Sequence, residues 1–128
     1  MENEKKLIML VDDNPANLRI GKNVLTGQYT VATAPSAAKM FSLLENNKPS
    51  LILLDIDMPM TNGFEAIKIL KAKPETRDIP VIFLTGKTES GDQAEGYTLG
   101  AAAYITKPFE PAALIACIAD HLQADDGY

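Results

Sequence analysis

The sequence predicts an α/β fold, in which a single (βα)5 domain has a parallel sheet with helices on both faces. Three observations predict it. Short apolar runs recur roughly every 25 residues, they are continuous rather than alternating, and segments with helical spacing lie between them. Continuous runs of this kind are typical of strands buried on both faces, as in a parallel sheet. Strict alternation of strands and helices then implies right-handed crossovers and a doubly wound sheet.

Five segments are the predicted strands. Four of them are apolar runs between turn residues, whereas residues 29–34 (YTVATA) alternate more and are therefore placed at an edge of the sheet. In chain order the predicted strands are Leu7–Val11, 29–34, Leu51–Leu54, Val81–Leu84 and Ala101–Ile105. Five strands in one domain favour the flavodoxin-like order 2-1-3-4-5.

The predicted helices begin at recognisable signals. A capping residue or a first-turn proline stands at three helix entries, which are Asn14-Pro15, Pro35-Ser36 and Glu110-Pro111. Apolar residues then recur on one helical face, at Leu18, Gly21 and Leu25, at Phe64, Ile67 and Leu70, and at Leu114, Ile115, Ile118 and Leu122. The predicted fourth helix contains SGDQAEGYTLG, residues 90–100. Gly91 and Gly96 indicate a labile element there, because an interior glycine costs about 1 kcal/mol relative to alanine.

Composition limits the classes of function. The 128 residues suit one domain, 1–128, with a core from about residue 6 to 123. The net charge of -5 and the lack of a basic cluster argue against direct binding to nucleic acid. A membrane-spanning helix needs about 20 consecutive apolar residues, and no apolar run in the sequence approaches this length. The single cysteine, Cys117, excludes an internal disulfide and suits a reducing cytoplasm.

Polar side chains follow the ends of four predicted strands. Asp12-Asp13 follow the first, Asp55 the third, Thr85 the fourth and Lys107 the fifth. Each has a plain structural explanation: Asp13 or Asn14 as a helix cap, Thr85 as a turn residue, and Lys107 as a solvated loop residue. However, the carboxyl ends of parallel strands share one edge, where doubly wound folds build their sites. Their joint placement therefore favours a functional site.

The chemistry of this set points to a phosphoryl group. Clustered carboxylates repel one another, and a hard divalent cation with oxygen ligands relieves the repulsion. Mg²⁺ suits such a site because it retains several waters and also binds phosphate oxygens. Lys107 adds a positive charge that can reach an anion. Asp55 is the candidate nucleophile, which would form an aspartyl phosphate.

Four motifs together resemble the receiver domain of response regulators in two-component signalling, including chemotaxis regulators. They are VDDN after the first predicted strand, DIDMPMTNG after the third, FLTG at the end of the fourth and YITKPF at the end of the fifth. Each motif alone is weak, but their order and spacing are specific, and the resemblance covers essentially the whole chain. The resemblance implies a cytoplasmic phosphoprotein and signalling switch.

The resemblance also implies residue roles. Asp55 would accept a phosphoryl group from a sensor histidine kinase or a small acyl phosphate. Asp13 and Asp55 would bind Mg²⁺ directly, Asp12 chiefly through water, and Asp57 through its backbone carbonyl. Thr85 would donate a hydrogen bond to the phosphoryl group and Lys107 would form an ion pair with it. Tyr104 would change position in the switch.

An effector protein or domain would bind the altered face of the fourth helix, fifth strand and last helix. The resemblance further implies a cis bond at Lys107-Pro108, and we expect a positive φ at Gly63 because it shapes the loop after Asp55. We expect Cys117, Met58 and Phe109 to serve packing, and His121 to suit the dipole at the end of the last helix.

Two other functions stay open. LILLDIDMP also resembles the DxD signature of haloacid-dehalogenase-type phosphatases, although that signature follows the first strand and precedes a Gly-Thr. The other alternative is a binding scaffold that acts without phosphorylation, against which the full acidic set argues. We expect no enzymatic activity beyond the domain's own phosphoryl transfer and autodephosphorylation. The short ends around the predicted strands and helices favour a free-standing regulator over a receiver cut from a longer chain.

Overall fold

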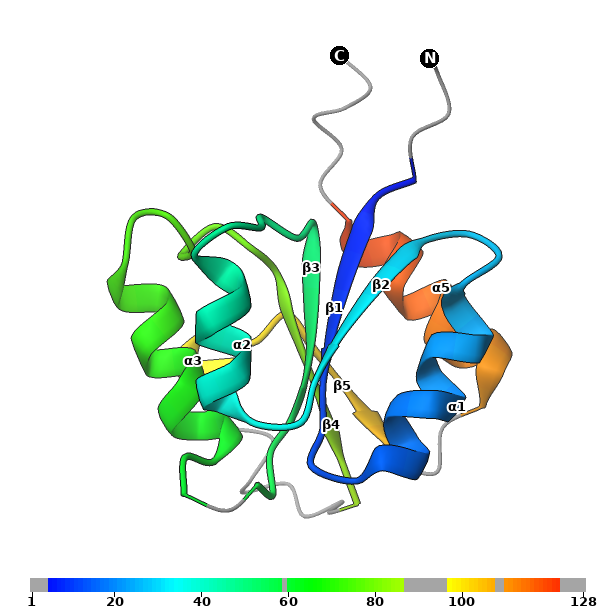
Figure 1. Cartoon of the computed structure of the whole chain (residues 1–128), viewed down its shortest axis with the longest axis horizontal. Helices are drawn as coiled ribbons and strands as arrows, with labels where there is room; N and C mark the ends of the chain where they lie inside the picture. The colour runs from blue at the N-terminus through cyan, green and yellow to red at the C-terminus, as the bar shows by residue number, and fades with distance from the viewer. Residues whose placement is uncertain (1–4, 59, 87–96, 108–109, 123–128) are drawn as a thin grey trace.

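The computed structural model describes residues 5–58, 60–86, 97–107 and 110–122. Within these residues, five strands form one sheet that lies between two layers of helices (Figure 1). In chain order the elements are β1 (Leu7–Val11), α1 (Pro15–Leu25), β2 (Thr30–Ala34), α2 (Ala37–Leu44), β3 (Leu51–Asp55), α3 (Gly63–Ala72), β4 (Val81–Thr85), β5 (Ala103–Thr106) and α5 (Pro111–His121).

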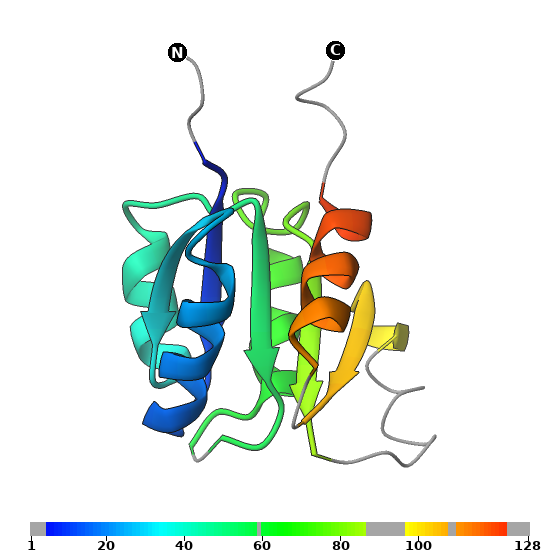
Figure 2. The ribbon, with the colours of Figure 1, turned by 90° about the vertical axis from the view of Figure 1, so that its right-hand side faces the viewer.

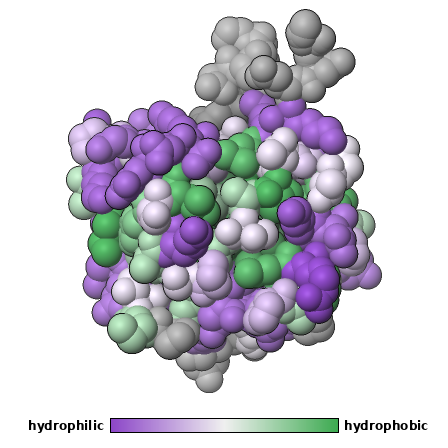
Figure 3. Space-filling view, in the orientation of Figure 1, coloured by the Kyte–Doolittle hydropathy of each residue, from purple (hydrophilic) through white to green (hydrophobic). Residues whose placement is uncertain are grey.

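The sheet has the predicted topology. Its strand order is β2-β1-β3-β4-β5, and all four pairings are parallel, which confirms the flavodoxin-like order. The strand with the alternating pattern, β2, lies at an edge, as predicted. Seen from this edge, the surface mixes hydrophobic and hydrophilic residues (Figure 3). By contrast, every residue of β3 and β4 is buried, which explains their continuous apolar sequences.

Helices cover both faces of the sheet. Helices α2 and α3 lie on one face and α1 and α5 on the other (Figures 1 and 2). Successive side chains of a strand point to opposite faces, so each strand contributes to two cores. In β3, for example, Ile52 and Leu54 pack in the core beneath α2 and α3, whereas Leu51 and Leu53 pack in the core beneath α1 and α5.

Side-chain caps fix two of the predicted helix starts. The side chain of Asn14 accepts a hydrogen bond from the backbone N–H of Ala16, at 2.8 Å, so Asn14 rather than Asp13 caps α1. Ser36 Oγ accepts one from Lys39 N at 3.1 Å and caps α2. These bonds satisfy N–H groups that lack a partner within the helix.

The prediction of a positive φ at Gly63 is wrong. Gly63 is the first residue of α3, and among the described glycines a positive φ occurs at Gly100, at 112°. A Cβ at Gly63 would lie 2.7 Å from the carbonyl oxygen of Asp55 and 2.8 Å from Cα of Ile56. Gly63 is therefore required by the close approach of α3 to the end of β3 rather than by its backbone angles.

Several smaller predictions concern the last third of the chain. Strand β5 begins at Ala103, two residues later than the predicted run, and Ala101 packs into the core instead. Residues 97–99 are helical and Gly100 follows them in a turn, whereas residues 90–96 of the predicted fourth helix, including Gly91 and Gly96, lie outside the described residues, as do Pro108 and Phe109. In α5, Cys117 is half-buried against the core and His121 occupies the last turn. No helix within the described residues is long and apolar enough to cross a membrane.

Candidate functional site

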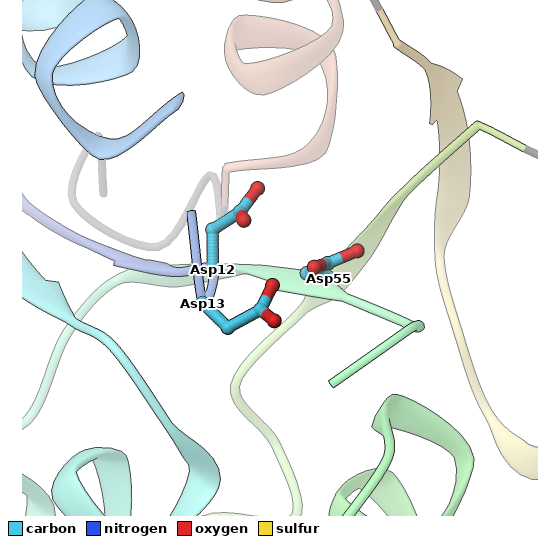
Figure 4. Close-up of side chains that lie close together, drawn as sticks. All are labelled: Asp12, Asp13 and Asp55. Carbon is cyan, nitrogen blue, oxygen red and sulfur yellow. The ribbon is translucent and has the colours of Figure 1, made fainter. Parts of the chain in front are cut away.

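Three carboxylates meet where β1 and β3 end. The register pairs Val11 with Leu54, so the next residues, Asp12 and Asp55, are neighbours across the two strands. Asp12, Asp13 and Asp55 each offer a carboxylate oxygen, and these oxygens lie within 4.8 Å of one another (Figure 4). Asp12 is 0% exposed and Asp55 is 2% exposed, whereas Asp13 is exposed to solvent. The cluster is therefore open at Asp13 and closed around the other two acids.

Lys107 brings a positive charge to this cluster. Its backbone N–H donates to the carbonyl of Thr85 at 2.8 Å, which extends the β4–β5 pairing by one residue. Its Nζ lies 3.1 Å from Asp12 Oδ2 and 3.1 Å from Asp55 Oδ1. One ammonium group thus forms ion pairs with two buried carboxylates, of which Asp12 directly follows β1 and Asp55 ends β3.

Hydrogen bonds from nearby groups fix the orientation of both buried acids. Asp12 Oδ1 accepts from the backbone N–H of Asn14 at 2.9 Å, and Asp12 Oδ2 accepts from Asn17 Nδ2 at 3.3 Å. Asp55 Oδ1 accepts from the backbone N–H of Asp57 at 3.3 Å. Because each bond stabilises the charged form of its acceptor, these contacts offset part of the cost of burial.

Burial nevertheless dominates the ionisation of Asp55. Loss of solvent and the neighbouring charge of Asp12 raise the pKa of Asp55 from 3.8 to about 6, although Lys107 and the Asp57 N–H act in the opposite direction. Burial alone would lower the pKa of Lys107, but Asp55 and Asp12 together outweigh it and raise that pKa. Lys107 therefore remains a cation beside an acid that is ionised only above weakly acidic pH.

The remaining predicted residues lie on the two neighbouring strands. Thr85 ends β4 and is 1% exposed. Tyr104 is half-buried in β5, opposite Phe83 of β4, and their ring centroids are 5.4 Å apart. The centroid of the Tyr104 ring also lies 5.3 Å from that of Tyr97, a residue that is 50% exposed. The Tyr104 ring therefore contacts both a fully buried ring of the core and a half-exposed ring at the surface.

The donor set fits a hard divalent cation. Three carboxylates supply anionic oxygen ligands, and the one exposed member, Asp13, leaves a route for the ion and its waters. A metal at this point would also relieve the repulsion that raises the pKa of Asp55. A pocket of about 270 Å³ lies elsewhere, between residues 44–48 and 75–79, at the opposite ends of the strands.

The structure thus brings together Asp12, Asp13, Asp55 and Lys107, as the sequence predicted. Asp57 is exposed, and its carboxylate is not part of the cluster that Asp12, Asp13 and Asp55 form. A contact of Asn17 with Asp12 was not predicted. Its signal in the sequence is a polar residue one helical turn beyond Asp13, at a position of α1 that faces the sheet edge.

Comparison with known proteins gives a consistent family. The family model described as the response regulator receiver domain matches residues 8–119. A probable cyclic di-GMP phosphodiesterase of Vibrio cholerae is 39% identical over 116 residues, which is 91% of this chain and 26% of that protein. The transcriptional regulatory protein YvrH of Bacillus subtilis is 38% identical over 122 residues, or 94% of this chain and 50% of that protein. The chain thus spans half or less of the length of these curated relatives.

Solved structures agree with the sequence comparison. The chemotaxis protein CheY4 of Vibrio cholerae has a TM-score of 0.88 at 25% identity, with 92% of this chain and 99% of that chain covered. The receiver domain of the sensor histidine kinase PA1611 of Pseudomonas aeruginosa has a TM-score of 0.83 at 27% identity, with 91% and 96% covered. That structure is described as having a magnesium ion coordinated in the active site cleft.

Proposed function

Because the chain belongs to the response regulator receiver domain family, whose members are phosphorylation-dependent switches, we propose that Asp55 is its phosphoacceptor. One observation carries the assignment. Asp55 is a buried carboxylate at a strand end, with two further acids beside it and a lysine ammonium 3.1 Å away. Asp12 is buried and already accepts bonds from three groups, and Asp57 lies outside the cluster, so neither is as well placed.

In the proposed reaction a carboxylate oxygen of Asp55 attacks phosphorus. The bond between phosphorus and the donor breaks as the new oxygen–phosphorus bond forms, and the donor, a kinase histidine or an acyl phosphate, leaves with the electron pair. Lys107 neutralises charge on the phosphoryl oxygens and Thr85 donates a hydrogen bond to one of them. Catalysis consists mainly of positioning and charge neutralisation, which the fixed orientation of Asp55 supports.

Asp13 and Asp55 would hold Mg²⁺ directly, Asp12 would do so chiefly through water, and the carbonyl of Asp57 would complete the protein ligands. When bound, the metal supplies positive charge that stabilises the transferring phosphoryl group. Of these residues, Asp12, Asp13 and Asp55 form the carboxylate cluster described above.

The proposal extends to partners and location. A sensor histidine kinase would supply the phosphoryl group, and an effector would bind the face that includes β5, α5 and residues 97–100 once Asp55 is phosphorylated. The domain would act in the cytoplasm and catalyse only its own phosphoryl transfer and autodephosphorylation. Our expectation that it does not contact nucleic acid concerns this domain alone, because relatives named as transcriptional regulators extend beyond the matched part.

The test is direct phosphorylation in vitro. Mixed with phosphoramidate or acetyl phosphate and Mg²⁺, the protein should gain one phosphoryl group, which mass mapping should locate on Asp55. Asp55→Asn should abolish the gain, chelation of Mg²⁺ should suppress it, and Asp57→Asn serves as the matched control two residues away. A modification mapped to Asp12 or Asp57 would contradict the assignment. Sustained turnover of a phosphomonoester would instead favour a phosphatase.

A further inference from the structure

Asp12 is the most completely enclosed acid of the site. It is 0% exposed, and three groups within the described residues donate hydrogen bonds to its oxygens. Asp12 Oδ1 accepts from the Asn14 backbone, whereas Asp12 Oδ2 is shared by Lys107 Nζ at 3.1 Å and Asn17 Nδ2 at 3.3 Å. Asn17 is half-buried and belongs to α1, so it reaches the acid from the helix layer rather than from the sheet.

Asp12 Oδ2 accepts from two donors, and one of them, Lys107, also has a role in phosphorylation. In the proposed function Lys107 forms an ion pair with the phosphoryl group on Asp55, which draws its ammonium group away from Asp12. A buried carboxylate oxygen that loses a direct donor is costly unless another donor remains. Among the residues that the structure describes, the donor that remains on Asp12 Oδ2 is the side-chain amide of Asn17.

We propose that Asn17 is a positioning residue that holds Asp12 in place when Lys107 turns to the phosphoryl group. The inference rests on the proposed function. Asn17 touches neither the phosphoryl group nor Asp55 in this role; it acts through Asp12. Its effect depends on Lys107, since each of the two donors compensates for the absence of the other.

A double-mutant cycle on the metal-free protein tests this dependence without phosphorylation. Urea unfolding is measured for Asn17→Leu, Lys107→Met and the double variant in the presence of a chelator. Asn17→Leu should reduce the folding equilibrium constant only slightly while Lys107 is present, but about 10-fold in the Lys107→Met background, as expected for a hydrogen bond to a buried charge. Equal effects in both backgrounds would mean that Asn17 has only a structural role.

The chain offers a matched control in the same helix. Asn23 also belongs to α1 but is exposed, so Asn23→Leu makes the same substitution without a contact to Asp12. It measures the change in helix propensity, and its effect should be the same with and without Lys107. If Asn17→Leu does not fold, Asn17→Ala and Asn23→Ala form the equivalent pair.

A second measurement tests whether the effect seen in the double-mutant cycle also affects phosphorylation. With saturating Mg²⁺, Asn17→Leu should lower the maximal rate of phosphorylation by phosphoramidate several-fold and leave the half-saturating donor concentration unchanged. Asn23→Leu should match the wild type. If the wild type gains no phosphoryl group, the proposed function is wrong. If the wild type is phosphorylated normally and Asn17→Leu behaves like Asn23→Leu in both assays, only the role of Asn17 is refuted.

Discussion

The buried position of Asp55 should make the metal-free protein less stable as pH rises. Its pKa is raised in the folded state, from 3.8 to about 6, so the folded protein binds this proton more tightly than the unfolded chain. The contribution to stability is therefore fully present below about pH 4 and is lost as pH rises through about 6. A shift of this size corresponds to about 3 kcal/mol of unfolding free energy.

Asp55→Asn should remove this pH dependence, because asparagine has a similar shape and does not ionise. With a chelator present, the variant should gain up to about 3 kcal/mol relative to the wild type between pH 4 and pH 7.5. Saturating Mg²⁺ should narrow the difference at pH 7.5, since a bound cation stabilises the charged form of the wild type.

The assay is urea unfolding at a series of pH values, followed by circular dichroism. Asp57→Asn controls for the substitution itself, because Asp57 lies two residues away and is exposed. A difference between Asp55→Asn and the wild type that stays constant from pH 4 to 7.5 would refute the reasoning. So would a variant that is less stable than the wild type at pH 7.5 without metal, because the burial cost would then be smaller than the attraction of Lys107.

Three further predictions concern packing around the site. Gly63→Ala should destabilise the protein by about 1–3 kcal/mol in urea unfolding and slow phosphorylation, because its Cβ would meet the carbonyl oxygen of Asp55 at 2.7 Å. Phe83→Ala should cost about 3–5 kcal/mol of unfolding free energy, measured in the same way, because this ring is fully buried and contacts the rings of Phe64 and Tyr104. Tyr97→Leu should remove a ring contact with Tyr104 that is worth about 0.5–1.5 kcal/mol. It should also change how tyrosine fluorescence responds to beryllofluoride, a response that can be measured because the chain has no tryptophan. An unchanged fluorescence response would contradict the last prediction.

The sequence was sufficient to predict the fold and the clustering of carboxylates at one edge of the sheet, because both depend on short-range patterns. Continuous apolar runs identify the strands, and the residues directly after them must share one edge of a parallel sheet. Asp12 and Asp55 are neighbours for this reason alone, as the register of β1 and β3 shows. The alternating pattern of residues 29–34 likewise placed β2 at the edge.

Other features depend on distances between side chains that are remote in sequence. The sequence indicated that Lys107 lies near the acids, but not that one Nζ contacts both Asp12 and Asp55. The prediction of a positive φ at Gly63 was wrong because glycine is required there by the close approach of one backbone segment to another. A turn motif in the sequence does not reveal such an approach. Asn17 was missed because a polar residue in the first turns of a helix is usually solvated, and only the packing of α1 brings it to Asp12.

The position of Thr85 on β4 indicates how a change at the carboxylates could reach the surface. Thr85 and Phe83 are two residues apart, so their side chains lie on the same face of the sheet. Phe83 lies opposite Tyr104 in β5, and the Tyr104 ring in turn contacts the half-exposed ring of Tyr97. Closely packed side chains do not deform gradually, so a shift at the end of β4 favours a discrete rearrangement of these rings. A small movement toward a phosphoryl group would therefore alter the surface around residues 97–104, where we expect the effector to bind.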